Sequence, residues 1–94
     1  MYPRLVRFSF GPGKYAEAQA IADNLAPFIA AQPGCGGVTV FGDDNTGDYG
    51  LFVLWDSEAE ANAAAQVIRP KLDQHLAGNV KEPPDARLFK VISS

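Results

Sequence analysis

The segment of residues 48–55 (DYGLFVLW) restricts the fold of this chain most, because both of its sides are apolar. Successive side chains of a β-strand point to opposite faces of the sheet. One face of this segment carries Tyr49, Leu51, Val53 and Trp55, and the other carries Phe52 and Leu54. Helices of a two-layer domain cover one side of a sheet, so a second apolar face is usually covered by another subunit. The pattern favours a homodimer formed through the sheet, although a single exposed Phe52 or Leu54 would also be tolerated.

The other periodic segments place this strand in a βαββαβ order. Alternating apolar residues predict strands, and apolar residues three and four positions apart predict helices. The expected elements are a strand at 4–10, a helix at 14–31, strands at 38–41 and 48–55, a helix from 58 towards Gly78, and a strand at 87–92. This order is typical of the ferredoxin-like fold. We therefore expect an α+β domain with an antiparallel four-stranded sheet and two helices on one face.

Capping residues and prolines set the expected limits of the helices. Ser57 and Glu60 form a capping box, which predicts the start of the second helix, and Gly78 suits its end. A proline inside a helix lacks the N–H that bonds the preceding turn. Pro27 is therefore expected to bend or end the first helix, and Pro70 to divide the second.

Composition excludes several classes of function. A chain of 94 residues is expected to form one domain, residues 1–94. Its eight Lys and Arg residues are scattered and its formal net charge is −3, so no nucleic-acid-binding surface is expected. No segment approaches the roughly 20 apolar residues of a membrane span, and no signal peptide is recognised, which predicts a soluble cytoplasmic protein that binds no membrane.

No cofactor or metal is expected from the motifs. A single cysteine, Cys35, and a single histidine, His75, cannot build a closed zinc site. The glycines of residues 11–13 lack the remainder of a phosphate-binding loop, and the acidic residues of 43–48 lack the glutamate of a calcium hand. We interpret both segments as turns.

Three residues are candidates for a functional pocket. His75, on the apolar side of the second helix, can act as a base or proton shuttle near neutral pH. Trp55 can stack on a flat ligand, and Arg7 lies on a largely apolar strand. Structural roles are the alternatives: a histidine that stabilises a helix end, a core tryptophan, and an arginine paired with a carboxylate across the sheet or dimer interface.

Two segments, residues 32–36 (QPGCG) and 54–61 (LWDSEAEA), resemble the turn after the first helix and the strand-to-helix junction of the antibiotic biosynthesis monooxygenase family. The resemblance spans nearly the whole chain. It implies a dimeric α/β barrel, in which two ferredoxin-like subunits join their sheets and each holds a pocket between sheet and helices. The family includes cofactor-independent oxygenases of polycyclic phenols, haem-degrading oxygenases and proteins without a known substrate.

The resemblance supplies three functional hypotheses. The first is a cofactor-independent monooxygenase acting on a small aromatic, polyketide- or quinol-like substrate, with His75 and Arg7 as catalytic residues and Trp55, Tyr49 and Phe52 in contact with the ring. The second is a non-catalytic small-molecule-binding or regulatory dimer. The third is haem degradation, for which His75 lies near the family's histidine, whereas Arg7 stands near the place of its asparagine and alanines surround the place of its helical tryptophan.

Overall fold

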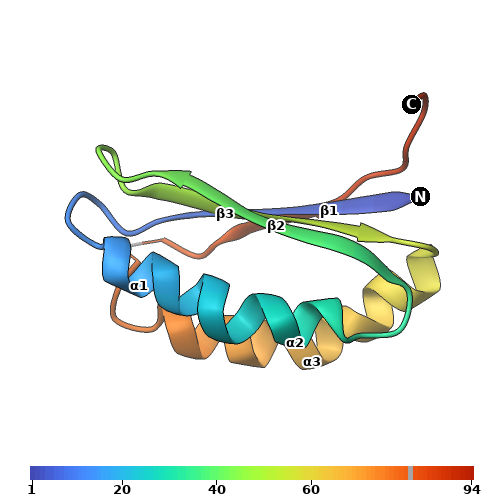
Figure 1. Ribbon diagram of the computed structural model, residues 1–94, viewed down its shortest axis with the longest axis horizontal. Coiled ribbons are helices and arrows are strands. Elements are labelled where there is room, and N and C mark those ends of the chain that lie inside the picture. The colour runs from blue at the N-terminus through green and yellow to red at the C-terminus, as the bar shows by residue number, and fades with distance from the viewer. Residues whose placement is uncertain (81) are drawn as a thin grey trace.

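The computed structural model describes residues 1–80 and 82–94 of the protein. Its elements follow a βαββαβ order in which the first helical region has three parts (Figure 1). They are β1 (Tyr2–Ser9), α1 (Tyr15–Ala20), η1 (Ile21–Leu25), α2 (Ala26–Ala30), β2 (Cys35–Asp43), β3 (Asp48–Trp55), α3 (Glu58–Leu76) and β4 (Asp85–Leu88). The predicted α+β ferredoxin-like architecture is confirmed.

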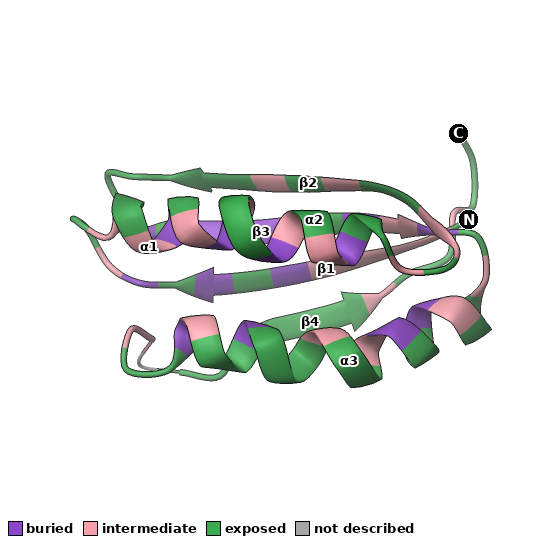
Figure 2. Cartoon of the chain, turned by 60° about the horizontal axis from the view of Figure 1, so that its bottom comes forward, coloured by how far each residue is buried: buried purple, intermediate pink, exposed green. Residues whose placement is uncertain are grey.

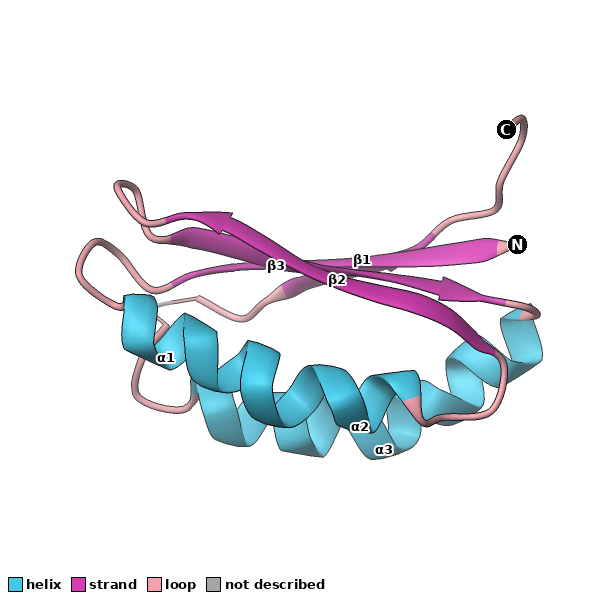
Figure 3. Ribbon diagram, in the orientation of Figure 1, coloured by secondary structure: helices cyan, strands magenta, loops and turns pink. Residues whose placement is uncertain are grey.

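One antiparallel sheet forms the first layer of the molecule. Its strand order is β2-β3-β1-β4, so β1 and β3 are central. In the register of the central pair, Val6 lies opposite Leu51 and Arg4 lies opposite Val53. All helices lie on one side of this sheet (Figure 3).

The hydrophobic core lies between the sheet and the helices. Figure 2 shows that buried positions concentrate on the central strands and on the sheet-facing sides of the helices, whereas the edge strands β2 and β4 are more exposed. The largest fully buried side chains are Trp55, Ile21, Leu25, Ile29 and Leu51. Each large apolar side chain buried in this way contributes about 1.5–3 kcal/mol to folding.

Pro27 was expected to bend the first helix or to end it, and the structure contradicts the early end. A π-helical turn, η1, precedes the proline, and the backbone N–H of Ala26 donates to the carbonyl of Ile21. Pro27 then occupies the first turn of α2, where its missing N–H costs little. The helix therefore continues to Ala30 instead of ending at the proline.

The expected division of the second helix at Pro70 is wrong. α3 runs without interruption from Glu58 to Leu76. Pro70 removes the bond to the carbonyl of Gln66, and both residues are exposed, so water can solvate that carbonyl. The predicted start is confirmed, because the Ser57 hydroxyl accepts a hydrogen bond from the Glu60 backbone N–H at 3.1 Å.

The last strand begins earlier than predicted. β4 starts at Asp85, and beyond Leu88 the backbone N–H groups of Phe89 and Val91 still donate to the carbonyls of Pro3 and Met1, at 2.8 and 3.0 Å. The chain thus stays beside β1 through Val91. Strand β2 is also longer than expected at both ends.

The face of the sheet opposite the helices is uncovered in the monomer (Figure 1). On it Phe52 is 37% exposed and Phe41 is 42% exposed. Leu5 lies directly opposite Phe52, and Leu54 follows on the same face. This side, which we call the open face, carries the second set of apolar residues that the sequence predicted.

Candidate functional site

A small cavity lies between the sheet and α3, and we call it the inner cavity. Its volume is about 70 Å³. Its walls include Val6, Leu51 and Val53 of the sheet and Ala61 and Ala65 of α3. The alanines leave room here because they occupy the sheet-facing side of the helix, where larger side chains would fill the space.

Two nitrogen donors at the inner cavity have no hydrogen-bond partner among the described residues. They are Nε of Arg4 and Nε1 of Trp55, and both residues line the cavity. Trp55 is 1% exposed and Arg4 is half-buried. Buried donors are normally satisfied, because an unpaired one costs about 1–3 kcal/mol. No protein atom among the described residues accepts from these two nitrogens, so both can donate to a ligand in the cavity.

Arg4 is held in the site by one polar contact. Its Nη2 donates to Oδ1 of Asn62 on α3 at 3.3 Å. Burial lowers the pKa of the Arg4 guanidinium, but an arginine side chain remains protonated at neutral pH. The ion pairs found within the described ranges, Arg69 with Asp73 and Arg87 with Asp85, do not include it.

A second, wider hollow of about 920 Å³ lies at the other end of the sheet, and we call it the end hollow. Phe8, Phe10 and Tyr49 line it, with ring centroids 5.1–6.3 Å apart. The Tyr49 hydroxyl donates to Oδ1 of Asp44 at 2.7 Å, and this bond raises the pKa of Tyr49 to about 12. Tyr49 is therefore protonated and occupied as a donor at neutral pH.

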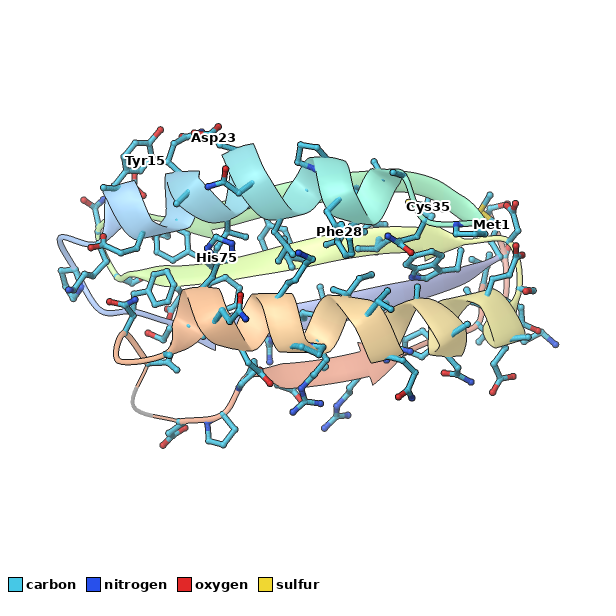
Figure 4. All side chains as sticks on the ribbon, turned by 90° about the horizontal axis from the view of Figure 1, so that it is seen from below. Met1, Tyr15, Asp23, Phe28, Cys35 and His75 are labelled. Atoms are coloured by element: carbon cyan, nitrogen blue, oxygen red, sulfur yellow. The ribbon has the colours of Figure 1, made fainter. Side chains whose placement is uncertain are left out.

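The structure does not bring the five predicted site residues together. Trp55 lines the inner cavity, Tyr49 and Arg7 line the end hollow, and Phe52 lies on the open face. His75 lines neither cavity. It lies half-buried in the last turn of α3, in the space between α3 and the first helical region (Figure 4). The roles assigned to these residues from the sequence stay predictions.

Arg7 and Arg4 show how strand alternation separates two similar residues. Arg7 is exposed and pairs in register with Gly50 and Asp85, on the open face. Arg4 shares its face with buried Val6, beneath the helices. Sequence reasoning missed Arg4 as a site residue, although its spacing of two from Val6 already placed a cation on the core face.

The described residues give no sign of a metal site or of a membrane span. No group of three or more His, Cys, Asp or Glu side chains gathers among residues 1–80 and 82–94. Within the same ranges, no helix combines the length and apolar character needed to cross a bilayer.

Comparison with known proteins identifies the fold. No protein-family model and no curated protein sequence matches this chain. Among solved structures, SnoaB, a cofactor-independent oxygenase of Streptomyces nogalater, is 21% identical, with a TM-score of 0.78 over 99% of this chain and 94% of SnoaB.

Two further structures agree. A Nitrosomonas europaea protein with a proposed antibiotic biosynthesis monooxygenase activity is 14% identical, with a TM-score of 0.82 over 99% of this chain and 100% of its own. The chain has the fold of the antibiotic biosynthesis monooxygenases. The monooxygenase ActVA-Orf6 of Streptomyces coelicolor, solved with nanaomycin D, shares this fold at 19% identity, with a TM-score of 0.77 over 99% of this chain and 88% of its own. At these identities the likeness to the monooxygenases establishes the fold, and the function rests on the site.

Proposed function

We propose that this protein is a cofactor-independent oxygenase of a small aromatic substrate, which binds in the inner cavity. The observation that carries the proposal is an apolar cavity whose unpaired polar atoms, Nε of Arg4 and Nε1 of Trp55, are both donors. An oxygen-bearing ring matches such a site, because its carbons suit the apolar walls and its oxygen accepts from the donors. SnoaB, which has the same fold, is a cofactor-independent oxygenase.

The proposed reaction needs no external reductant. A single-ring phenolic substrate loses a proton, and the resulting anion, which has carbanion character on the ring, reduces O₂ in the cavity. One oxygen atom becomes a new carbonyl on the ring carbon, and the other leaves as water with two hydrogens of the substrate, one from that carbon and one from the phenolic hydroxyl. The protein contributes by stabilising negative charge on the substrate oxygen with the fixed donors of Arg4 and Trp55.

The proton acceptor is the solvent in this proposal. The side chains that line the inner cavity include no carboxylate and no imidazole, and His75 and Arg7 lie outside it. Stabilisation of the anion by Arg4 lowers the substrate's own pKa, so that water or hydroxide can remove the proton.

The same absence of an acid–base side chain favours a second candidate, a small-molecule-binding protein without catalysis. Oxygen uptake distinguishes the two. The substrate is hydroquinone, whose single ring suits the small cavity, with a chelator present and spontaneous oxidation subtracted. The proposal expects uptake above this background that is lost in Ala65→Leu, which fills the cavity, and retained in Ala63→Leu on the exposed side of α3. Substrate binding without any oxygen uptake would contradict catalysis and support the non-catalytic binding protein.

Haem is not proposed as a ligand, because the residues do not fit it. His75, the single histidine, lines neither cavity. The inner cavity, at about 70 Å³, is far smaller than the roughly 300–1,000 Å³ of pockets that take drug-sized ligands.

We further propose a homodimer in which two copies pair through the open face. Its apolar surface consists of Leu5, Phe41, Phe52 and Leu54, and the Phe41 ring packs over Gly50. Contiguous exposed apolar surface of this kind usually marks an interface. Sedimentation velocity tests the proposal: a monomer at micromolar concentration would contradict it.

A further inference from the structure

Arg4 carries a positive charge into the space under the sheet without a matching negative charge. It lies on β1 between β3 and β4, opposite Val53 on one side and Leu88 on the other. Its hydrogen-bond partner, Asn62, is neutral. The Nε atom of Arg4 is itself buried, and buried charged groups are nearly always paired because their desolvation is costly.

Trp55 brings a second donor to the same place. In the antiparallel register Arg4 lies opposite Val53, and Trp55 is the next residue of β3 on that face. Diagonal neighbours of this kind lie about 7–8 Å apart at the backbone, within reach of long side chains. An arginine and an indole can therefore donate to one group between them.

The identity of the missing acceptor follows from these two residues. Neutral acceptors would satisfy the Trp55 N–H but would leave the Arg4 charge without a counter-charge. The other lining residues supply no anion: the walls are apolar, and the remaining charged side chain there is Arg69, a second cation that is bound to Asp73. An anionic oxygen satisfies both requirements.

We infer that the inner cavity binds its ligand as an oxyanion, a phenolate or a small carboxylate, which accepts hydrogen bonds from Nε of Arg4 and Nε1 of Trp55. The inference rests on the proposed function in using the same cavity, and it names the charge and size of the ligand. A cavity of about 70 Å³ is about half of the engineered cavity of about 150 Å³ that holds benzene. The ligand is therefore limited to one ring, partly seated in the mouth, and fused polycyclic rings are excluded.

The test compares an anion with a neutral molecule of similar shape. The probe is 4-nitrophenol, whose ionised form absorbs visible light, and the neutral analogue is nitrobenzene. The ionised probe should bind at least about 10-fold more tightly than nitrobenzene, since a hydrogen bond to a charged group is worth about one to two powers of ten. The bound probe should also stay ionised at a lower pH than the free one.

Variants assign the effect to Arg4. Arg4→Gln should weaken binding of the ionised probe by about 10- to 100-fold and leave nitrobenzene binding unchanged. Arg4→Lys keeps the charge and should recover part of the affinity. Arg87→Gln is the matched control, because Arg87 is exposed, pairs with Asp85 and lines neither cavity, so its loss should have little effect.

The possible results separate the two proposals. Equal binding of the ionised probe and nitrobenzene would overturn the oxyanion inference. Oxygen uptake that is lost in Ala65→Leu would still support the proposed function in that case. Failure of both molecules to bind would overturn the inner cavity as a ligand site, and the proposed function with it. Unchanged binding of the ionised probe to a folded Arg4→Gln variant would show that Arg4 does not contact the ligand.

Discussion

Replacing Ala65 with leucine should stabilise the protein and abolish ligand binding. Ala65 lies on α3, is half-buried and lines the inner cavity. Unfilled cavity volume costs about 24 cal/mol per Å³, so the space of about 70 Å³ corresponds to about 1.7 kcal/mol. Leucine is a good helix former and adds only apolar atoms. The free energy of unfolding should therefore rise by up to about 1.7 kcal/mol, a gain of up to about 7–14 °C in Tm for a domain of this size.

Urea unfolding measures the first effect and 4-nitrophenol absorption the second. Trp55 is the single tryptophan and reports unfolding by its fluorescence. Ala63→Leu is the matched control, since the same change on the exposed side of α3 should stay within about 0.5 kcal/mol and retain binding. Destabilisation of Ala65→Leu by more than about 1 kcal/mol, typical of overpacking, or intact ligand binding would refute the presence of this cavity beside Ala65.

Three other changes probe the rest of the account. Ser57→Ala removes the acceptor of the Glu60 N–H and should lower the free energy of unfolding by about 1 kcal/mol in a urea titration, with Ser57→Asp close to the parent. The pKa of Tyr49 is raised from 10.0 to about 12 by its bond to Asp44, so its stabilising effect is complete below pH 10.0 and lost as the pH rises towards 12. Tyr49→Phe should remove that alkaline decline, and an unchanged decline in unfolding experiments would reject this cause. Phe52→Asp on the open face should shift a dimer to monomers in sedimentation velocity, and an unaffected dimer would move the interface elsewhere.

Strand alternation and helix capping carried most of the fold prediction. Residues 48–55 became β3 at the expected bounds, and the Ser57 hydroxyl caps α3 as expected. The prolines were harder to interpret, because their effect depends on context. A π-helical turn places Pro27 at a tolerated position, and solvent around Pro70 allows α3 to continue.

The candidate site was harder to predict from the sequence than the fold. Arg7 was predicted as a site residue because it is a cation on an apolar strand. Its side chain points to the same face as that of Leu5, two positions earlier, and this is the open face. Arg4 lies two positions before Val6 and therefore on the core face of β1. It was overlooked because it is the first residue of the apolar segment. The inner cavity itself arises from alanines of α3 facing the sheet, and an alanine in a helix pattern does not show whether it packs tightly or leaves space.

The most direct test of the account is the indole N–H resonance of Trp55 in a ¹⁵N-labelled sample. The chain has one tryptophan, so the signal needs no assignment. Addition of 4-nitrophenol, with the phenol ionised, should shift this resonance strongly downfield to saturation, because the unpaired Nε1–H gains an anionic acceptor. Ala65→Leu should abolish the shift. Saturable binding of 4-nitrophenol that leaves the indole resonance in place would contradict the inner cavity as the functional site.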